Sequence, residues 1–142
     1  MIVKLFIDTW GWLTLRDRRE ARHSEASAFY KNFRRQKGRV YTSDYVLDET
    51  ITLLFRRLSF PSAQESLLYI EQSVAAGYLQ LERITPERFE KAKGLRGKFQ
   101  DKPLISFTDL TSMVVMEECG IVQILTEDEH FLHVGMGFQR MP

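Results

Sequence analysis

The stretch that decides the fold runs from Ser106 to Phe131 and reads SFTDLTSMVVMEECGIVQILTEDEHF. Ser106 and Asp109 have the spacing of a capping box, which marks the start of a helix. The apolar residues after them predict a buried helix that ends at Gly120, because glycine commonly terminates helices. The run Ile121–Thr126 then has the length and composition of a short buried strand. A buried helix followed by a buried strand favours an α/β protein.

Two carboxylates lie at the ends of this unit. Asp109 falls in the first turn of the predicted helix, and Asp128 follows the predicted strand. A charge beside an apolar core costs several kcal/mol, roughly, unless a hydrogen bond, a cation or a metal compensates it. Taken singly, Asp109 fits a helix cap and Asp128 fits the start of a turn. A local role and a shared charged site both remain open for these two residues.

Strands and helices are predicted to alternate along the rest of the chain. Ile2–Ile7 is an apolar run, broken only by Lys4, that predicts a buried strand ending at Asp8. Further strands are predicted at 40–42, 78–84 and 138–141, and helices at 17–37, 45–58, 61–76 and 86–99. This alternation indicates a mostly parallel sheet covered on both faces. Since no repeat or linker interrupts the pattern, we expect one α/β domain over residues 1–142.

The composition excludes several classes of protein. The chain has 142 residues, a formal net charge of +1 and a single cysteine, Cys119. Nucleic-acid binding would therefore depend on local clusters of Lys and Arg. One cysteine excludes an intramolecular disulfide and a cysteine-based zinc site, and it fits a reducing compartment, so we expect a cytoplasmic protein. No membrane association is expected, because the sequence contains neither a signal peptide nor about 20 consecutive apolar residues.

Four carboxylates are candidates for one site: Asp8, Glu49, Asp109 and Asp128. In open α/β sheets ligands bind outside the carboxyl ends of the strands, where Asp8 and Asp128 are predicted to lie. Glu49 and Asp109, in early turns of two helices, could point into the same crevice, although Glu49 also fits a solvated helical turn. Four carboxylates repel one another unless hard cations are present. Mg²⁺ and Mn²⁺ prefer oxygen ligands, and two such ions about 4 Å apart can clamp a phosphodiester during hydrolysis.

Four pieces of the sequence carry a family resemblance: FIDTWGWL at 6–13, TSDYVLDET at 42–50, SFTDLTSMVVMEECGI at 106–121 and ILTEDEHF at 124–131. In this order, and in a chain of this length, they resemble the PIN-domain ribonucleases, most closely the VapC-like toxins of prokaryotic toxin–antitoxin pairs. The third and fourth pieces are the most specific. The resemblance implies a PIN-like three-layer sandwich with a mostly parallel central sheet flanked by helices.

The resemblance also assigns the site residues, position by position. It makes catalytic and metal-binding residues of Asp8, Glu49, Asp109 and Asp128, and supporting hydroxyls of Thr9 and Thr108. Asp48 and Glu49 cannot both face one point, because successive helical residues differ by about 100°. The family pattern selects Glu49. Trp10 departs from the pattern, since the family often has a small residue there.

The function that the resemblance implies is a metal-dependent endoribonuclease that uses Mg²⁺ or Mn²⁺ and acts as the toxin of a type II toxin–antitoxin system. A cognate antitoxin and a homodimer are implied with it. Basic side chains can hold an RNA backbone by phosphate contacts, and the candidates are Arg16, Arg56 and Arg57. We assign no catalytic role to the histidines, which are His23, His130 and His133.

Three alternatives remain open at this point. Two lie within the same fold: an RNA-processing nuclease, and a catalytically weak module that only binds. The third is a receiver-type phosphoacceptor domain, which also places aspartates around magnesium at strand ends. A receiver would have paired acids after its first strand and a lysine after its last. Here Asp8 stands alone, and no lysine follows Ile121–Thr126.

Overall fold

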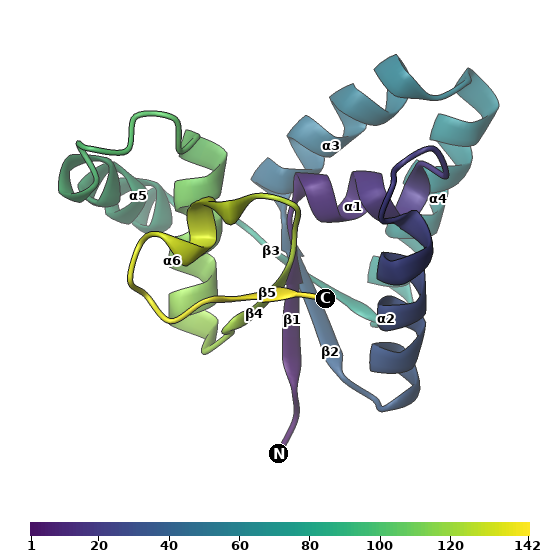
Figure 1. Cartoon of the computed structure of the whole chain (residues 1–142), viewed down its shortest axis with the longest axis horizontal. Coiled ribbons are helices and arrows are strands. Elements are labelled where there is room, and N and C mark those ends of the chain that lie inside the picture. The colour runs from purple at the N-terminus through teal and green to yellow at the C-terminus, as the bar shows by residue number, and fades with distance from the viewer.

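A fully parallel sheet of five strands forms the centre of the molecule (Figure 1). The computed structural model describes residues 1–142. The strands, in chain order, are β1 (Lys4–Ile7), β2 (Arg39–Ser43), β3 (Leu79–Glu82), β4 (Gln123–Leu125) and β5 (Gln139–Met141). Their order in the sheet is β3-β2-β1-β4-β5. The sequence predicted all five strands within a few residues, including the less central positions of β3 and β5.

Helices cover the sheet on both sides, which confirms the three-layer α/β prediction. The helices are α1 (Thr9–Arg16), α2 (His23–Arg35), α3 (Asp44–Arg57), α4 (Phe60–Ala75), α5 (Pro86–Lys98) and α6 (Phe107–Cys119), with a 3₁₀ turn η1 at Glu129–Leu132. In Figure 1, α5 and α6 lie on one side of the sheet and α2 and α4 on the other. None of the helices combines the length and the apolar character that a bilayer span requires.

The strand order excludes the receiver-type alternative. Receiver domains have the strand order 2-1-3-4-5. Here the chain first builds outward from β1 through β2 to β3, and then returns to the other side of β1 to add β4 and β5. The point where the direction of building reverses therefore lies between β1 and β4. Such a switch point is where open α/β sheets bind ligands.

The core is built on β1 and α6. Leu5, Phe6 and Ile7 of β1 are fully buried, as expected for a central strand covered on both faces. Helix α6 buries the continuous run from Leu110 to Met116, so it is apolar around most of its circumference. Its ends match the prediction, because the Ser106 hydroxyl caps the first turn and Gly120 adopts a left-handed conformation with φ of 68°.

The segment after β1 differs from the prediction of a single helix over 17–37. Asp8 caps a separate helix, α1, which ends at Arg16, with Asp17 as its C-cap. The Asp17 carboxylate does not begin the next helix, because it pairs with Arg19 at 3.0 Å and lies 3.8 Å from Arg57. Helix α2 starts only at His23. The apolar residues after Asp8 thus form a helix of their own.

Helix α1 packs closely against the sheet at Gly11. A Cβ atom at this position would overlap the carbonyl oxygen of Leu125 and would lie 2.9 Å from Cγ2 of Ile7. The absence of a side chain at Gly11 therefore lets the first turn of α1 lie directly against β1 and β4.

We expect Gly11→Ala to destabilise the fold. Overpacking against a backbone atom costs about 1–3 kcal/mol, which outweighs the roughly 1 kcal/mol that alanine contributes over glycine inside a helix. The matched control is Gly94→Ala in α5, where the added methyl meets nothing within 4 Å and should raise stability. Urea denaturation of both variants measures the difference. Equal midpoints for the two variants would show that α1 does not pack tightly at Gly11.

Candidate metal centre

Asp8 and Thr126 meet because of the register between β1 and β4. Ile7 pairs with Leu125, so the next residue of each strand leaves the sheet beside the other. The Thr126 hydroxyl donates a hydrogen bond to Oδ2 of Asp8 at 2.5 Å, and the Gly11 N–H donates to Oδ1 at 2.8 Å. Asp8 is only 2% exposed. Its carboxylate is therefore fixed in a buried position at the switch point of the sheet.

The same threonine also positions Asp128. The backbone N–H of Asp128 donates to the Thr126 hydroxyl oxygen at 2.9 Å. Asp128 then caps η1, since its Oδ1 accepts from the N–H of His130 at 2.8 Å. One hydroxyl group thus connects the two aspartates that follow neighbouring strands. Asp128 thus begins a turn, as its local interpretation predicted, and also lies close to the other acids.

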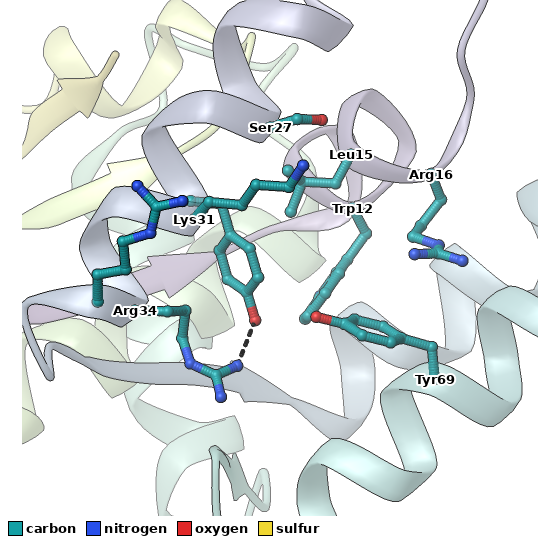
Figure 2. A pocket seen from close by; sticks show the side chains of 9 residues that line it. Trp12, Leu15, Arg16, Ser27, Lys31, Arg34 and Tyr69 are labelled. Atoms are coloured by element: carbon teal, nitrogen blue, oxygen red, sulfur yellow. Dashed lines mark hydrogen bonds between the residues drawn. The ribbon is translucent and has the colours of Figure 1, made fainter.

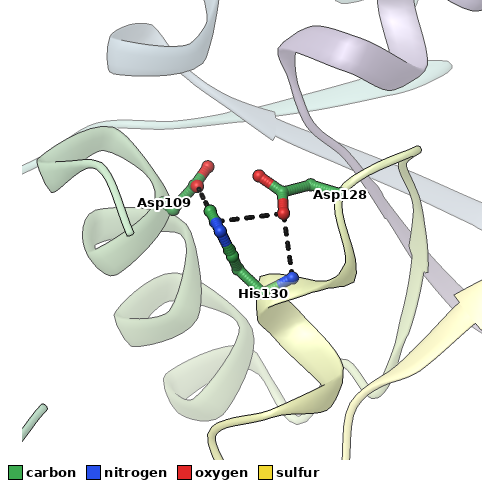
Figure 3. Close-up of side chains that lie close together, drawn as sticks. All are labelled: Asp109, Asp128 and His130. Atoms are coloured by element: carbon green, nitrogen blue, oxygen red, sulfur yellow. Dashed lines mark hydrogen bonds and ion pairs between the residues drawn. The ribbon is translucent and has the colours of Figure 1, made fainter. Parts of the chain in front are cut away.

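Asp109 and Asp128 lie side by side, and Nδ1 of His130 approaches both carboxyl groups (Figure 3). Asp109 lies in the first turn of α6, where its N–H donates to the Ser106 hydroxyl at 3.0 Å. Nδ1 of His130 is 3.0 Å from Oδ1 of Asp128 and 3.7 Å from Oδ2 of Asp109. The sequence had suggested no role for His130, yet its Nδ1 approaches two of the four candidate acids.

The pKa values of two aspartates show how strongly the fold disfavours their charged forms. Burial is the main cause that raises the pKa of Asp8 to about 8; hydrogen bonds from Thr126 and Gly11 oppose this shift, and the charges of Asp109 and Asp128 add to it. Burial, followed by the charge of Asp128, raises the pKa of Asp109 to about 7. Carboxylates in ordinary solvent titrate near 4. The fold therefore favours the protonated forms of these two carboxyls, and a bound cation would favour their charged forms.

Glu49 belongs to the same electrostatic environment but makes no hydrogen bond or ion pair. It lies on α3 and is half-buried. Burial raises the pKa of Glu49, and the charge of Asp48 adds to this effect. Glu49 in turn contributes to the raised pKa of Asp109. All four predicted acids are thus linked by mutual charge effects, with Asp109 and Asp128 sharing the contact to His130.

The two threonines expected to support the acids make other contacts. The Thr9 hydroxyl donates to the carbonyl oxygen of Val46 at 3.4 Å, which connects α1 to α3. The carbonyl oxygen of Thr108 accepts hydrogen bonds from the hydroxyls of Thr111 and Ser112 within α6. Neither threonine side chain forms a hydrogen bond to a carboxylate. Among the four candidate acids, Asp8 receives its threonine hydrogen bond from Thr126.

The three arginines expected to contact RNA occupy different settings. Arg57 pairs with Glu20 at 2.6 Å, and Arg56 is exposed and has no ion-pair partner. Arg16 lies at the far end of α1, where its guanidinium donates to the Ser66 hydroxyl at 3.0 Å. Only Arg56 and Arg16 are therefore free of carboxylates.

The residues present fit a divalent cation. Asp109, Asp128 and His130 each offer a ligand atom, and these atoms lie within 4.8 Å of one another. Atoms bound about 2.0–2.2 Å from a single ion stand roughly 3–4.4 Å apart, so little rearrangement is needed. Nδ1 of His130 is buried and makes no well-directed hydrogen bond, which leaves it available. The carboxylate oxygens suit Mg²⁺ or Mn²⁺, whereas an imidazole nitrogen suits Zn²⁺ or Fe²⁺ better.

Thr126 and His130 are the two site residues that the sequence analysis missed. Both lie in the ILTEDEHF segment, two residues before and two residues after Asp128. The spacing of a histidine two residues after an aspartate was the available signal for His130. The contact of Thr126 with Asp8 joins residues 118 positions apart, so only the strand pairing could have indicated it.

Known proteins with related sequences share this architecture. The 23S rRNA-specific endonuclease VapC20 of Mycobacterium tuberculosis, from strains CDC 1551 / Oshkosh and H37Rv, is 30% identical over 131 residues, which cover 92% of this chain and 94% of that protein. The crystal structure of Mycobacterium tuberculosis VapC20, described as a Sarcin-Ricin loop cleaving toxin, gives a TM-score of 0.76 at 29% identity and covers 92% of this chain and 95% of that one.

A more distant solved structure shares the fold alone. The DNA-bound VapBC complex of Salmonella typhimurium contains a chain with a TM-score of 0.68 and 13% identity, covering 99% of this chain and 98% of that one. The family model for the PIN domain matches residues 5–136, which include the four candidate acids. This chain therefore belongs to the PIN domain family.

Proposed function

We propose that this protein is a metal-dependent endoribonuclease and the toxin of a type II toxin–antitoxin system. One observation carries the proposal: the acidic group at the β1–β4 switch point, in a PIN domain that is 30% identical to an rRNA-specific endonuclease over 94% of its length. RNA is accordingly the substrate class that we propose, and the cytoplasm is the proposed location of the protein. A cognate antitoxin protein and a homodimer are the partners that we propose with it.

In this proposal Asp8, Glu49, Asp109 and Asp128 hold Mg²⁺ or Mn²⁺. A bound divalent cation supplies the charge that offsets the carboxylates and polarises a phosphodiester for hydrolysis. The protein's own part is to position the ligands. Thr126 orients Asp8 and Asp128 through one hydroxyl group, and the raised pKa of Asp8 means that its buried carboxyl carries a proton near neutral pH when no cation is bound.

Asp109→Asn should reduce RNA cleavage by about 100-fold or more, because loss of one charged group that stabilises a transition state typically has effects of this size. The assay uses purified chain and end-labelled RNA with Mg²⁺ or Mn²⁺, with and without chelator. His133→Ala is the control and should cleave as the wild type does, since this exposed side chain makes no contact with the acids.

The products separate the possible mechanisms. We expect 5′-phosphate and 3′-hydroxyl ends and no cleavage in chelator. Ends carrying a 2′,3′-cyclic phosphate, or full activity in chelator, would contradict metal-dependent hydrolysis. Tight Mn²⁺ binding without any cleavage would instead support a module that only binds. A reading frame for a small DNA-binding protein next to the gene would favour the toxin over an RNA-processing enzyme.

Asp8→Asn should stabilise the metal-free protein at pH 8. The pKa of Asp8 is raised from 3.8 to about 8, so the folded state binds more protons than the unfolded state between these values, and stability falls as the pH rises. Asparagine does not titrate, so the variant avoids this loss of stability. We expect thermal melts in chelator to show a midpoint about 3 °C or more above wild type at pH 8, and a smaller difference at pH 5.

The same melts with Mn²⁺ complete the test. The cation should raise the wild-type midpoint, because ligands that bind only the folded state stabilise it, and should raise that of Asp8→Asn less. If Asp8→Asn melts lower than wild type in chelator and gains as much from Mn²⁺, Asp8 has a purely structural role.

A further inference from the structure

A basic cavity is lined by residues of α1, α2 and α4 (Figure 2), and none of the four candidate acids lines it. Its volume is about 610 Å³. Figure 2 shows Trp12 extending from α1 toward Tyr69 of α4. The lining contains no acidic residue and four cationic ones, which are Arg16, Lys31, Arg34 and Arg35. This is a dense concentration of positive charge for a chain whose formal net charge is +1.

None of these four cations is neutralised within the protein. No carboxylate oxygen lies within ion-pair distance of any of them, whereas Arg19, Arg57 and Arg88 are all paired. Lys31 and Arg35 are exposed and make no side-chain hydrogen bond. Like charges gathered in one hollow repel one another, so the cavity is electrostatically complementary to an anion with several charged groups.

Two of the guanidinium groups are already held in place. Arg16 lies 4.7 Å from the centre of the Tyr69 ring, and Arg34 lies 4.5 Å from that of Tyr78. Arg34 also donates to the Tyr30 hydroxyl at 3.1 Å. Side chains that are ordered in advance lose less conformational entropy on binding, and a guanidinium retains further N–H groups that match the oxygens of a phosphate.

Helix α1 connects this cavity to the acidic group. It begins after its cap, Asp8, and ends at Arg16. Eight helical residues span about 12 Å, a distance that a few nucleotides of single-stranded RNA can bridge. A single RNA strand whose phosphate lies near Asp8 can therefore place phosphates a few nucleotides away among the four cations.

We propose that the cavity binds phosphate groups of the RNA substrate, at a site separate from the one where the strand is cut. This inference rests on the proposed function, because it assumes that another part of the same RNA strand binds at the acidic group. An acidic protein segment is the less favoured occupant, since α1 leads from the cavity to the acidic group, where only a nucleic-acid strand would also be bound, and since Trp12, the largest apolar lining residue, is fully buried. RNA needs only the exposed and half-buried cations.

The test measures binding in chelator, where no metal-dependent cleavage occurs. The probe is a fluorescein-labelled single-stranded RNA, and its anisotropy is followed with the full-length chain. The double variant Lys31→Ala/Arg35→Ala removes two exposed cations that make no hydrogen bond within the protein. The control, Lys93→Ala/Lys98→Ala, removes two exposed cations from α5 on the other side of the sheet.

We expect the cavity variant to weaken RNA binding by about tenfold, and its slope of log affinity against log salt to fall by roughly 1.4, since each lost single-strand phosphate contact removes about 0.7. The control should change affinity less than the cavity variant and should keep its slope. Equal losses in both variants, or none in the cavity variant, would overturn the proposal. So would tighter binding of a labelled polyglutamate peptide than of RNA at the cavity.

Binding and cleavage also distinguish this proposal from the proposed function. If RNA binding depends on Lys31 and Arg35 but no metal ion produces cleavage, the cavity is an RNA site and the nuclease proposal fails. If the wild type cleaves RNA and the cavity variant binds RNA unchanged, the nuclease proposal stands and the cavity proposal fails.

Discussion

The parallel pairing of β1 with β4 is the constraint on which the rest of the site depends. Because Ile7 lies opposite Leu125, Asp8 and Thr126 leave the sheet side by side and join through a hydrogen bond of 2.5 Å. Helix α1 starts from one of these residues, and the turn that carries Asp128 starts from the other. The pairing joins segments more than a hundred residues apart, so the acidic group can exist only in the folded chain.

Much of the fold could be predicted from the sequence because its signals are local. The buried runs of β1 and β4 are continuous and apolar, and α6 has a serine cap at one end and a left-handed glycine at the other. The segment around Asp17 was predicted wrongly because its signal is not local. Its carboxylate has the chemistry of a helix cap, but Arg19 and Arg57 occupy it, and Arg57 arrives from α3.

The site could be predicted only in part, for the same reason. Asp8, Asp109 and Asp128 stand at strand or helix ends that a sequence reveals, whereas Glu49 lies in the second turn of α3. The joint role of the four acids in binding a cation remains a prediction. The contact of Thr126 with Asp8 and the approach of His130 to both Asp109 and Asp128 depend on how distant segments meet. The basic cavity was equally hidden, because Arg16, Lys31 and Tyr69 come from three separate helices.

Helix α1 also limits how this chain can change in length. It is a short rigid rod with a buried carboxylate at one end and Arg16 at the other. A substitution on the surface of α1 leaves the positions of its two ends unchanged. One inserted residue would rotate its C-terminal end by about 100° and move it by about 1.5 Å along the helix axis. Gly11 could not stay against β4 while Arg16 kept its place beside Tyr69. Insertions and deletions should therefore accumulate in exposed connections such as residues 100–104, and spare the interval from Asp8 to Asp17.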